Sequence, residues 1–374
     1  MKTLRRALAG VVTLLVLWPV TAATANSTAL QCATQIVSSW STDQLAREVV
    51  VVSVTATSTL IMTQAAQLGF GGLLVFGSTA PEDFANTLHR LPSEQPRHLA
   101  MAVMSDDEGG GVIRASNVVG TWPWPQDMAR TMSAQQIRAL GARVGARMAA
   151  AGLTMDLAPV ADVDGRAEWP SASNPDGLRS FGGNPNVDAV DATAFAQGLA
   201  SAGVVATLKH FPGLGGASAN TDDAKATTQS WARLQTSALT PFRAGIASGV
   251  GAIMMANASV PGLTPLPASL SPVAVAALRH MGFSGLILTD ALSAGAISFR
   301  HIGIGDAAVS AIAAGDDEVL AGTPRSPAAG LATAMTMANA ISAGVGRGSI
   351  SHHTLVSAAA QVVAAVNPEV CSSR

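Results

Sequence analysis

The chain has 374 residues and a formal net charge of −2, and its few basic residues are dispersed along the sequence. Without a basic patch in the sequence, nucleic-acid binding is excluded as the expected function. Hydrophobic residues make up 48% of the chain and charged residues 12%, which suits a large buried core in one large barrel or two ordinary domains.

The first 25 residues have the pattern of an export signal. A positively charged start is followed by a mostly apolar stretch over 7–20 and by the small-residue cleavage site Ala23-Thr24-Ala25. The apolar stretch is shorter than the roughly 20 residues that a membrane span needs. We therefore predict a signal peptide over 1–25 and a mature chain, 26–374, that is secreted or associated with the cell envelope.

The mature chain has two cysteines, Cys32 and Cys371, which lie near its opposite ends. In an exported protein an even number of cysteines predicts a disulfide, here one that ties both termini to the same body. Two unrelated thiols are the alternative. A lipid anchor on Cys32 is disfavoured, because Leu30-Gln31 lacks the small residue that lipoprotein processing needs directly before the cysteine.

Short apolar segments alternate with helical patterns along the mature chain. Helices are expected after a cap at Ser41 or Thr42, over 58–68, and from Ser133, where Ser133 and Gln136 have capping-box spacing. Eight apolar segments are predicted to be strands: 49–54, 71–77, 99–104, 153–160, 204–208, 252–256, 285–289 and 317–321. None alternates polar with apolar residues, which indicates strands buried on both faces.

Eight strand–helix units predict an α/β protein, a single-domain (β/α)₈ TIM barrel over 26–374. A doubly wound sheet is the runner-up, but it would more often carry a glycine-rich phosphate turn after its first strand. The three glycines at 109–111 instead follow carboxylates, which would repel a phosphate. The long connection over 109–132 is expected on the side of the site. Its Trp122 and Trp124 are expected to pack a lid onto the barrel, with stacking on a ligand as the alternative.

Polar side chains gather where the predicted strands end, which is where barrel enzymes place their active sites. In chain order they are Asp106, Asp107, Glu108, Asp162, Asp164, Arg179, Lys209, His210, Asp222, Asp223, Asn257 and Asp290. This pattern favours a site for a polar substrate that needs proton transfer. No metal or other cofactor is expected, because no paired histidines stand at a strand end and the consecutive acids at 106–108 point to opposite faces.

A pair of carboxylates flanking a cleft is the usual apparatus of glycoside hydrolysis. Asp290 ends an apolar strand whose packing fixes its position, and nearby Lys209 would favour its ionised form, so Asp290 is the candidate nucleophile. Charged donors and acceptors suit sugar hydroxyls, each of which both gives and takes a hydrogen bond. The candidate sugar contacts are Asp106, Arg179, Lys209 and His210.

Six motifs resemble those of glycoside hydrolase family 3 and occur in the family's order. They are SDDEGGGVIR at 105–114, LAPVADV at 157–163, GLRSFGGNP at 177–185, KHFPG at 209–213, PASLSP at 267–272 and GFSGLILTDAL at 282–292. The chain is similar to the single-domain bacterial β-N-acetylhexosaminidases that act on cell-wall and chitin-type sugars. The resemblance implies a (β/α)₈ barrel, Asp290 as the nucleophile that forms a glycosyl-enzyme, and contacts to the −1 sugar by Asp106, Arg179, Lys209 and His210.

The loop after KHFPG departs from the family pattern. There the family has HG and then D-S-H, whose histidine is the acid/base, whereas this chain has Leu214 and then Asn220-Thr221-Asp222. Asn257 also stands where the family often has a histidine. Three interpretations follow: Asp222 is the acid/base, Asp223 or another acid takes that role, or hydrolysis is lost and the protein binds glycans at the envelope.

The retained nucleophile favours an enzyme that acts on O-glycosyl bonds. We predict a retaining β-N-acetylhexosaminidase that releases terminal N-acetylglucosamine from amino-sugar glycans, with Asp290 and Asp222 as its catalytic residues. A β-glucosidase is the alternative within the enzymes.

Overall fold

The structure is a computed structural model that describes residues 21–372, with side chains described for residues 28–370. Most of the predicted signal peptide, residues 1–20, lies outside the described residues. Export therefore stays a prediction.

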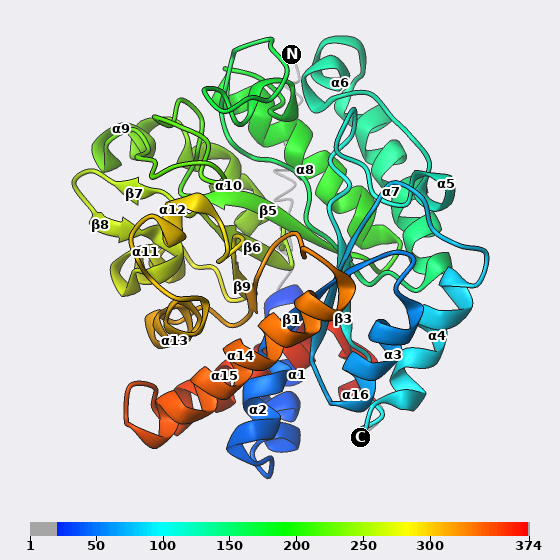
Figure 1. The fold of residues 1–374 in the computed structure, drawn as a ribbon. Helices are drawn as coiled ribbons and strands as arrows, with labels where there is room; N and C mark the ends of the chain where they lie inside the picture. Colours follow the sequence, from blue (N-terminus) through cyan, green and yellow to red (C-terminus); the bar gives the residue numbers. More distant parts are fainter. Residues whose placement is uncertain (1–20, 373–374) are drawn as a thin grey trace, which may run out of the picture.

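Eight parallel strands form the centre of the described chain (Figure 1). They are β1 (Val50–Thr55), β2 (Gly72–Phe76), β3 (Ala102–Ser105), β4 (Met155–Asp156), β5 (Val205–Phe211), β6 (Ala252–Met255), β9 (Leu286–Thr289) and β10 (Val319–Leu320). Their spatial order is β10-β1-β2-β3-β4-β5-β6-β9, and a parallel bridge between Leu288 and Glu318 brings the two ends of the sheet together. The predicted α/β barrel and its eight predicted strands are confirmed.

Helices surround the strands. They are α1 (Thr21–Val37), α2 (Thr42–Glu48), α3 (Thr59–Gln67), α4 (Phe84–Glu94), α5 (Ser116–Val119), α6 (Pro125–Thr131), α7 (Ala134–Ala151), α8 (Pro185–Ser201), α9 (Trp231–Thr236), α10 (Leu239–Ala247), α11 (Pro272–His280), α12 (Gly295–Ser298), α13 (Ile304–Ala314), α14 (Pro327–Gly346), α15 (His352–Val366) and α16 (Pro368–Ser372). Ser41 caps α2, as predicted, and forms a capping box there, and the predicted capping box at Ser133 is present. By length and composition α14 is long and apolar enough to cross a membrane, and it packs against α13, β1 and α2.

A small hairpin was not expected from the sequence. Strands β7 (Ser259–Val260) and β8 (Thr264–Pro267) pair in antiparallel fashion after β6. With two residues in β7 and prolines at 265 and 267, this segment carries too little strand pattern to be recognised.

Side chains on the strands alternate between the barrel interior and the surrounding helices. The interior layers consist of Val51, Leu74, Ala102, Met104, Met155, Leu157, Ala252, Met254, Leu286, Leu288 and Leu320. Their neighbours in sequence, such as Val103 and Ile287, pack into the larger core beneath the helices. Burial on both faces explains why the strands are continuously apolar in sequence.

The amino-terminal end of the barrel is covered by α15. Val362 of α15 packs against the interior layers, and Asn367 just after the helix receives a hydrogen bond of 2.8 Å from the backbone nitrogen of Ala100. Ala100 precedes β3, so α15 closes the end of the barrel where the strands begin. Ligands therefore have to enter at the opposite, carboxyl end.

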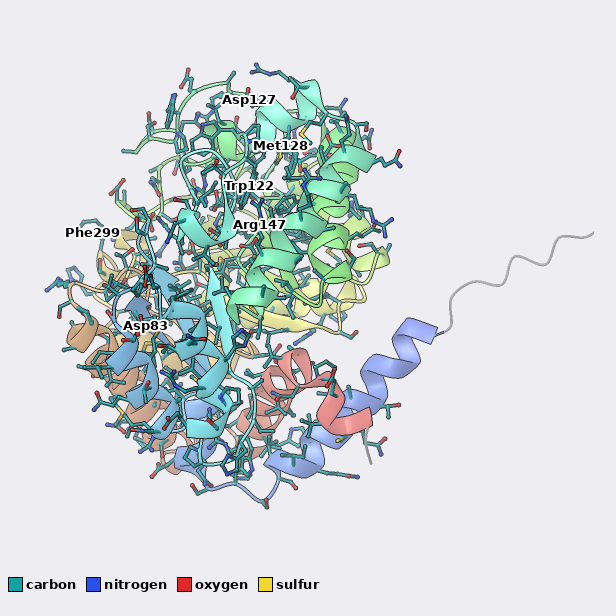
Figure 2. The ribbon with its side chains drawn as sticks, turned by 90° about the vertical axis from the view of Figure 1, so that its right-hand side faces the viewer. Asp83, Trp122, Asp127, Met128, Arg147 and Phe299 are labelled. Atoms are coloured by element: carbon teal, nitrogen blue, oxygen red, sulfur yellow. The ribbon has the colours of Figure 1, made fainter. Side chains whose placement is uncertain are left out.

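The connection between β3 and α7 forms the lid that the sequence predicted. Trp122 and Trp124 are buried, and Met128 of α6 is fully buried. The guanidinium of Arg147 in α7 donates a 3.2 Å hydrogen bond to the carbonyl of Val119, which ties the connection to the barrel shell. Figure 2 labels Arg147 together with Trp122 and Met128 of the connection. Trp122 belongs to the main core and its ring contacts that of Phe195 in α8, so it packs the lid onto the barrel as expected, whereas Trp124 is buried against Gly110 and Trp169.

The two ends of the described chain lie together, because α16 packs against α1. Cys32 of α1 is disulfide-bonded. Cys371 belongs to α16, but its side chain lies outside the described residues. The Cys32–Cys371 pairing stays a prediction.

A buried acid stands at the bottom of the barrel. Glu318 is 0% exposed, and both of its carboxyl oxygens lack a hydrogen-bond partner. Gly72 makes room for it, since a Cβ added there would lie 2.8 Å from Glu318 Oε1. Burial, together with the charges of Glu48 and Asp317, raises the pKa of Glu318 to about 8.

At pH 7 the free energy of unfolding of the Glu318→Gln variant is expected to exceed that of the wild type by on the order of 1–2 kcal/mol. In the unfolded chain Glu318 ionises near pH 4.5, whereas in the folded protein it stays neutral up to about pH 8. The free energy of unfolding of the wild type therefore falls as pH rises between these values. The variant has no ionisable group at this position and does not show this fall. Denaturant unfolding from pH 4 to pH 9 measures the difference.

The exposed Glu82 provides the matched control, because Glu82→Gln is expected to change the free energy of unfolding little at any pH. A gain for Glu318→Gln that does not grow between pH 5 and pH 8 would contradict the buried, neutral state of Glu318.

Candidate active site

A cavity of about 400 Å³ opens among the loops that follow the barrel strands. Every residue predicted to be catalytic or to contact the sugar lines it: Asp106, Arg179, Lys209, His210, Asp222 and Asp290. Arg114, Pro175 and Asn220 contribute to the same wall, and Leu74, Leu157, Met254 and Leu320 form the floor from the barrel interior. The sequence therefore identified side chains that the fold brings together from across the chain.

Strand alternation explains how three of these side chains reach the cavity. Asp106 follows the interior residues Ala102 and Met104 by the strand's two-residue period, and Asp290 follows Leu286 and Leu288 in the same way. Lys209 of β5 lies on the opposite face from Leu208, which packs beneath the helices. All three side chains therefore project from strand ends toward the barrel axis.

Two cations of the site are held by one buried carboxylate, Glu108. Its oxygens accept hydrogen bonds from Arg179 Nε at 2.6 Å and Arg179 Nη2 at 2.7 Å, and Lys209 Nζ lies 2.6 Å from Glu108 Oε1. The Lys209 ammonium also pairs with Asp106. Burial raises the pKa of Glu108, but the charges of Arg179 and Lys209 outweigh this effect and hold that pKa below its usual range.

The role of Glu108 was not assigned from the sequence, although its motif was noted. Glu108 fixes Arg179 and Lys209 in position for a ligand. It also helps to keep Lys209 ionised: burial lowers the pKa of Lys209, but the charges of Asp106 and Glu108 raise it by more, so that the pKa is raised overall. The signal in the sequence was the two-residue spacing of Asp106 and Glu108, which puts both acids on the same side of an extended segment.

Asp107 points the other way, as strand alternation predicted. It accepts hydrogen bonds from Ser105 Oγ at 2.5 Å and from the backbone nitrogen of Arg114 at 2.6 Å, and its own backbone nitrogen donates to Asp156 at 3.0 Å. Burial raises the pKa of Asp107 to about 7. Asp107 therefore holds the loop between Asp106 and Arg114 in shape and does not line the cavity.

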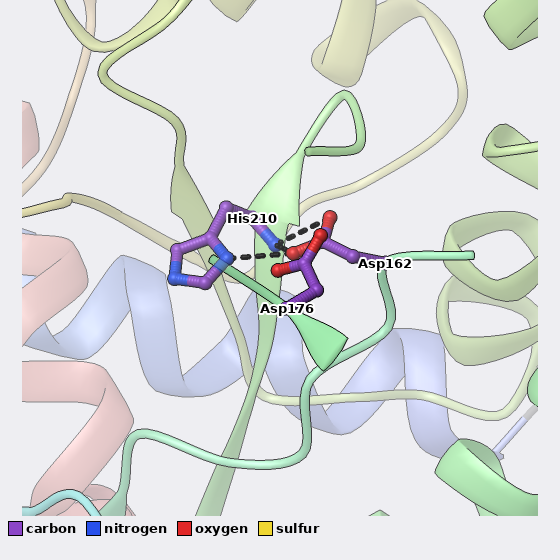
Figure 3. Close-up of side chains that lie close together, drawn as sticks. All are labelled: Asp162, Asp176 and His210. Atoms are coloured by element: carbon purple, nitrogen blue, oxygen red, sulfur yellow. Dashed lines mark hydrogen bonds and ion pairs between the residues drawn. The ribbon is translucent and has the colours of Figure 1, made fainter. Parts of the chain in front are cut away.

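His210 is oriented by the buried carboxylate of Asp162 (Figure 3). The His210 Nδ1 and Asp162 Oδ2 atoms lie 2.7 Å apart, and Asp162 Oδ1 also accepts a 2.6 Å hydrogen bond from the backbone nitrogen of Leu214. With Nδ1–H donating to Asp162, Nε2 is the ring nitrogen left for a ligand. Burial lowers the pKa of His210 to about 4, so the ring is neutral at pH 7.

Asp176 completes a buried group with Asp162 and His210 (Figure 3). Among the described residues, these three offer donor atoms close enough to surround a cation, within 4.8 Å of one another. However, both Asp162 oxygens already accept hydrogen bonds. Burial and the charge of Asp162 raise the pKa of Asp176 well above its usual value, which favours its neutral form. Both Asp176 oxygens are buried without a hydrogen-bond partner, and a cofactor-free site stays our prediction.

Asp290 is held at the end of β9. Its backbone nitrogen donates to the carbonyl of Met255 at 2.9 Å, and its Oδ1 accepts a 2.6 Å hydrogen bond from the backbone nitrogen of Ala291. Burial raises the pKa of Asp290, while the hydrogen bond from the Ala291 nitrogen and the charge of Lys209 lower it. The expected influence of Lys209 on Asp290 is thus present.

Asn257 lies behind Asp290 and outside the cavity lining. Its amide nitrogen donates to the carbonyl of Ala291 at 2.7 Å, and its oxygen accepts from Ser269 at 2.6 Å. Asn257 thus anchors the backbone that follows Asp290.

Asp222 stands on an irregular loop that docks on α12. The backbone nitrogens of Gly295 and Ala296 donate to the carbonyls of Asp222 and Thr221 at 2.8 and 2.9 Å. Gly295 is required there, since a Cβ at this position would lie 2.8 Å from the carbonyl oxygen of Asp222. The backbone of the loop is therefore fixed at the residue that lines the cavity.

The carboxyl of Asp222 has the electrostatic surroundings of a proton donor. The Asp222 side chain is exposed toward the open cavity, but the loss of hydration there raises its pKa, Arg179 lowers it, and the charges of Asp223 and Asp106 raise it. The charge of Asp222 in turn raises the pKa of Asp290, so the two carboxyls interact across the cavity. Asp223, the alternative acid, is exposed and lies outside the cavity lining.

Comparison with known proteins places these residues in a family context. The profile of the glycosyl hydrolase family 3 N terminal domain matches residues 42–365. The beta-hexosaminidase LpqI of Mycobacterium tuberculosis is 35% identical over 262 residues, which are 67% of this chain and 65% of that relative. The solved structure of M. tuberculosis LpqI superposes with a TM-score of 0.80 at 30% identity, over 90% of this chain and 97% of that chain. A family 3 beta-N-acetylglucosaminidase from Paenibacillus sp. str. FPU-7 superposes with a TM-score of 0.79 at 27% identity, over 89% of this chain and 64% of that chain.

Proposed function

The chain belongs to glycosyl hydrolase family 3, and on that premise we propose that it is an exported, retaining β-N-acetylhexosaminidase with Asp290 as nucleophile and Asp222 as acid/base. The observation that carries the proposal is the placement of these two carboxyls, which interact electrostatically in one cavity among charged sugar-binding groups. Retaining glycosidases use such a pair of carboxyl groups.

The reaction follows from the two environments. The ionised Asp290 attacks the anomeric carbon while the bond to the leaving oxygen breaks, and that oxygen takes the proton of Asp222. A glycosyl ester on Asp290 results. Water then attacks the same carbon, Asp222 takes a proton from the water, and Asp290 is released as a carboxylate. Two inversions return the sugar in its original β configuration.

The cavity wall supplies the contacts to the sugar in the −1 subsite. Asp106 is an acceptor, whereas Arg179 and Lys209 are donors fixed by Glu108. His210 is neutral, and its Nε2 accepts from a hydroxyl when Nδ1–H is held by Asp162. Fixed groups of both kinds suit the hydroxyls of a sugar, which give and take hydrogen bonds at once.

The choice of an N-acetylated sugar rests on the names of the relatives, a beta-hexosaminidase and a beta-N-acetylglucosaminidase. Terminal N-acetylglucosamine on cell-wall or chitin-type glycans is the corresponding substrate. A glycan-binding envelope protein without hydrolysis is the competing function, and it rests on the sequence departure at 220–222.

The kcat/KM for aryl β-N-acetylglucosaminides is expected to exceed that for the matching β-glucosides by about a hundredfold. A glucoside lacks the acetamido group, so the polar groups of the site that would bind it are left without a partner. Initial rates on both series with the mature protein test this. Higher rates on the glucosides would assign a β-glucosidase. Sugar binding without turnover of either series would assign the glycan-binding function.

A further inference from the structure

Trp169 is a large aromatic side chain that stays in contact with solvent. Trp169 is 68% exposed, although tryptophan gains much from burial. Its ring meets that of Trp124 edge to face, with centroids 5.2 Å apart, and a Cβ added at Gly111 would lie 3.4 Å from it. Because Trp124 is buried, one side of Trp169 is held against the lid and the rest is open.

The loop that carries Trp169 is attached to the cavity wall just before this residue. The carbonyl of Glu168 accepts a 2.9 Å hydrogen bond from the backbone nitrogen of Leu178, next to Arg179. Gly177 lets this contact form, since a Cβ there would lie 2.2 Å from the Glu168 oxygen. Trp169 is therefore one residue away from a backbone contact with the segment that supplies a sugar-binding cation.

The same loop is attached to the loop of Asp222 just after Trp169. The carbonyl of Ala172 accepts a 2.9 Å hydrogen bond from the backbone nitrogen of Asn220, and Asn220 and Asp222 both line the cavity. Consecutive Cα atoms are about 3.8 Å apart, so the Cα of Trp169 lies within about 11 Å of that of Ala172. Trp169 thus lies on a short loop segment that is attached on both sides to segments lining the cavity, one of them the loop of Asp222.

The side of the proton donor is also the side on which the leaving group departs. We propose that Trp169 is the platform on which the leaving-group sugar of the glycan stacks, an inference that rests on the proposed function. An indole ring offers an apolar face to the carbon-bound hydrogens of a sugar and an N–H group to a hydroxyl. In this proposal the sugar in the −1 subsite makes no contact with Trp169, whereas the adjoining leaving-group sugar stacks on its ring.

Contacts to a remote part of a substrate contribute to catalysis when that part is present. Trp169→Ala is therefore expected to lower kcat/KM for the β-1,4-linked disaccharide of N-acetylglucosamine about tenfold more than kcat/KM for the trifluoroethyl β-N-acetylglucosaminide. Trifluoroethanol is a leaving group without a ring, so it has no face to stack. Trp169→Phe, which keeps an aromatic face, is expected to restore most of the loss on the disaccharide.

Val190→Ala is the matched control, because Val190 is exposed on α8 and not part of the cavity lining; it is expected to leave the ratio of the two kcat/KM values unchanged. A ratio unchanged in Trp169→Ala, or a loss that Trp169→Phe does not restore, would overturn the platform while leaving the proposed hydrolysis intact. If the wild type turned over neither substrate, the proposed function would fail and the platform with it.

Discussion

Asp290→Asn is expected to lower kcat on every β-N-acetylglucosaminide at least about ten-thousandfold, because the amide that replaces the carboxylate cannot form the glycosyl ester. The substitution keeps the size of the side chain, which is held at the end of an apolar strand and by the hydrogen bond from the Ala291 nitrogen. Initial rates on activated and unactivated substrates measure the effect. Hydrolysis of both classes of substrate needs the nucleophile, so the activity on both should be lost.

Binding separates this loss from misfolding. Asp290→Asn leaves Arg179, Lys209 and their carboxylate partner Glu108 in place. It is therefore expected to bind N-acetylglucosamine within about tenfold of the wild-type affinity. Residual turnover above about one-hundredth of the wild-type rate, in a variant that binds sugar normally, would remove Asp290 from the role of nucleophile.

Asp222→Asn is expected to lower kcat/KM by roughly a hundredfold to ten-thousandfold for substrates with poor leaving groups, and far less for dinitrophenyl glycosides, which leave without a proton. The wild-type rate on poor leaving groups should fall as pH rises through the pKa of Asp222, which loss of hydration in the cavity raises above its usual value. The acid works only while protonated, so this alkaline limb should be missing from the variant. A series of aryl glycosides assayed across pH tests both points.

The neighbouring acid is the matched control for this prediction. Asp223 is exposed and outside the cavity lining, so Asp223→Asn is expected to leave the dependence on leaving group unchanged. Equal losses on good and poor leaving groups in Asp222→Asn would contradict its role as the acid. If instead Asp223→Asn lost far more activity on poor than on good leaving groups, Asp223 would be the proton donor.

The barrel could be predicted because its strands are buried on both faces. That burial makes each strand continuously apolar, and turns and helix caps mark the strand ends, as the capping box at Ser133 shows. The short β7–β8 hairpin could not be predicted, because it is held by pairing after β6 and its own residues lack a strand pattern. Local sequence carries little information about contacts of that kind.

The cavity residues Asp106, Lys209, His210 and Asp290 were also predictable, since each ends or directly follows a buried strand, whereas the role of Asp222 was inferred from the resemblance to the family. The residues that hold these side chains were not predictable. Glu108 and Asp162 contact Lys209 and His210 only after strands β3 to β5 come together. In the sequence they are merely further acids after a strand. The same applies to Gly295, whose missing Cβ matters because the loop of Asp222 packs against it.

The exposed Trp169 shows a different limit. The sequence drew attention to Trp122 and Trp124, which are buried in the lid. Among the tryptophans of the described residues, Trp169 is the exposed one, and the hydrogen bond between Ala172 and Asn220 reveals that its loop is attached to the loop of Asp222. Which aromatic residue packs and which stays open is decided by contacts between loops.

Mass spectrometry of the Asp222→Ala variant mixed with dinitrophenyl β-N-acetylglucosaminide tests the central claim most directly. The activated leaving group departs without an acid, whereas hydrolysis of the ester is slowed because the base is missing, so the intermediate should accumulate. We expect the protein to gain the mass of one N-acetylglucosaminyl group on the peptide that contains Asp290. Release of dinitrophenol with no adduct at Asp290, or with the sugar on another residue, would contradict the account.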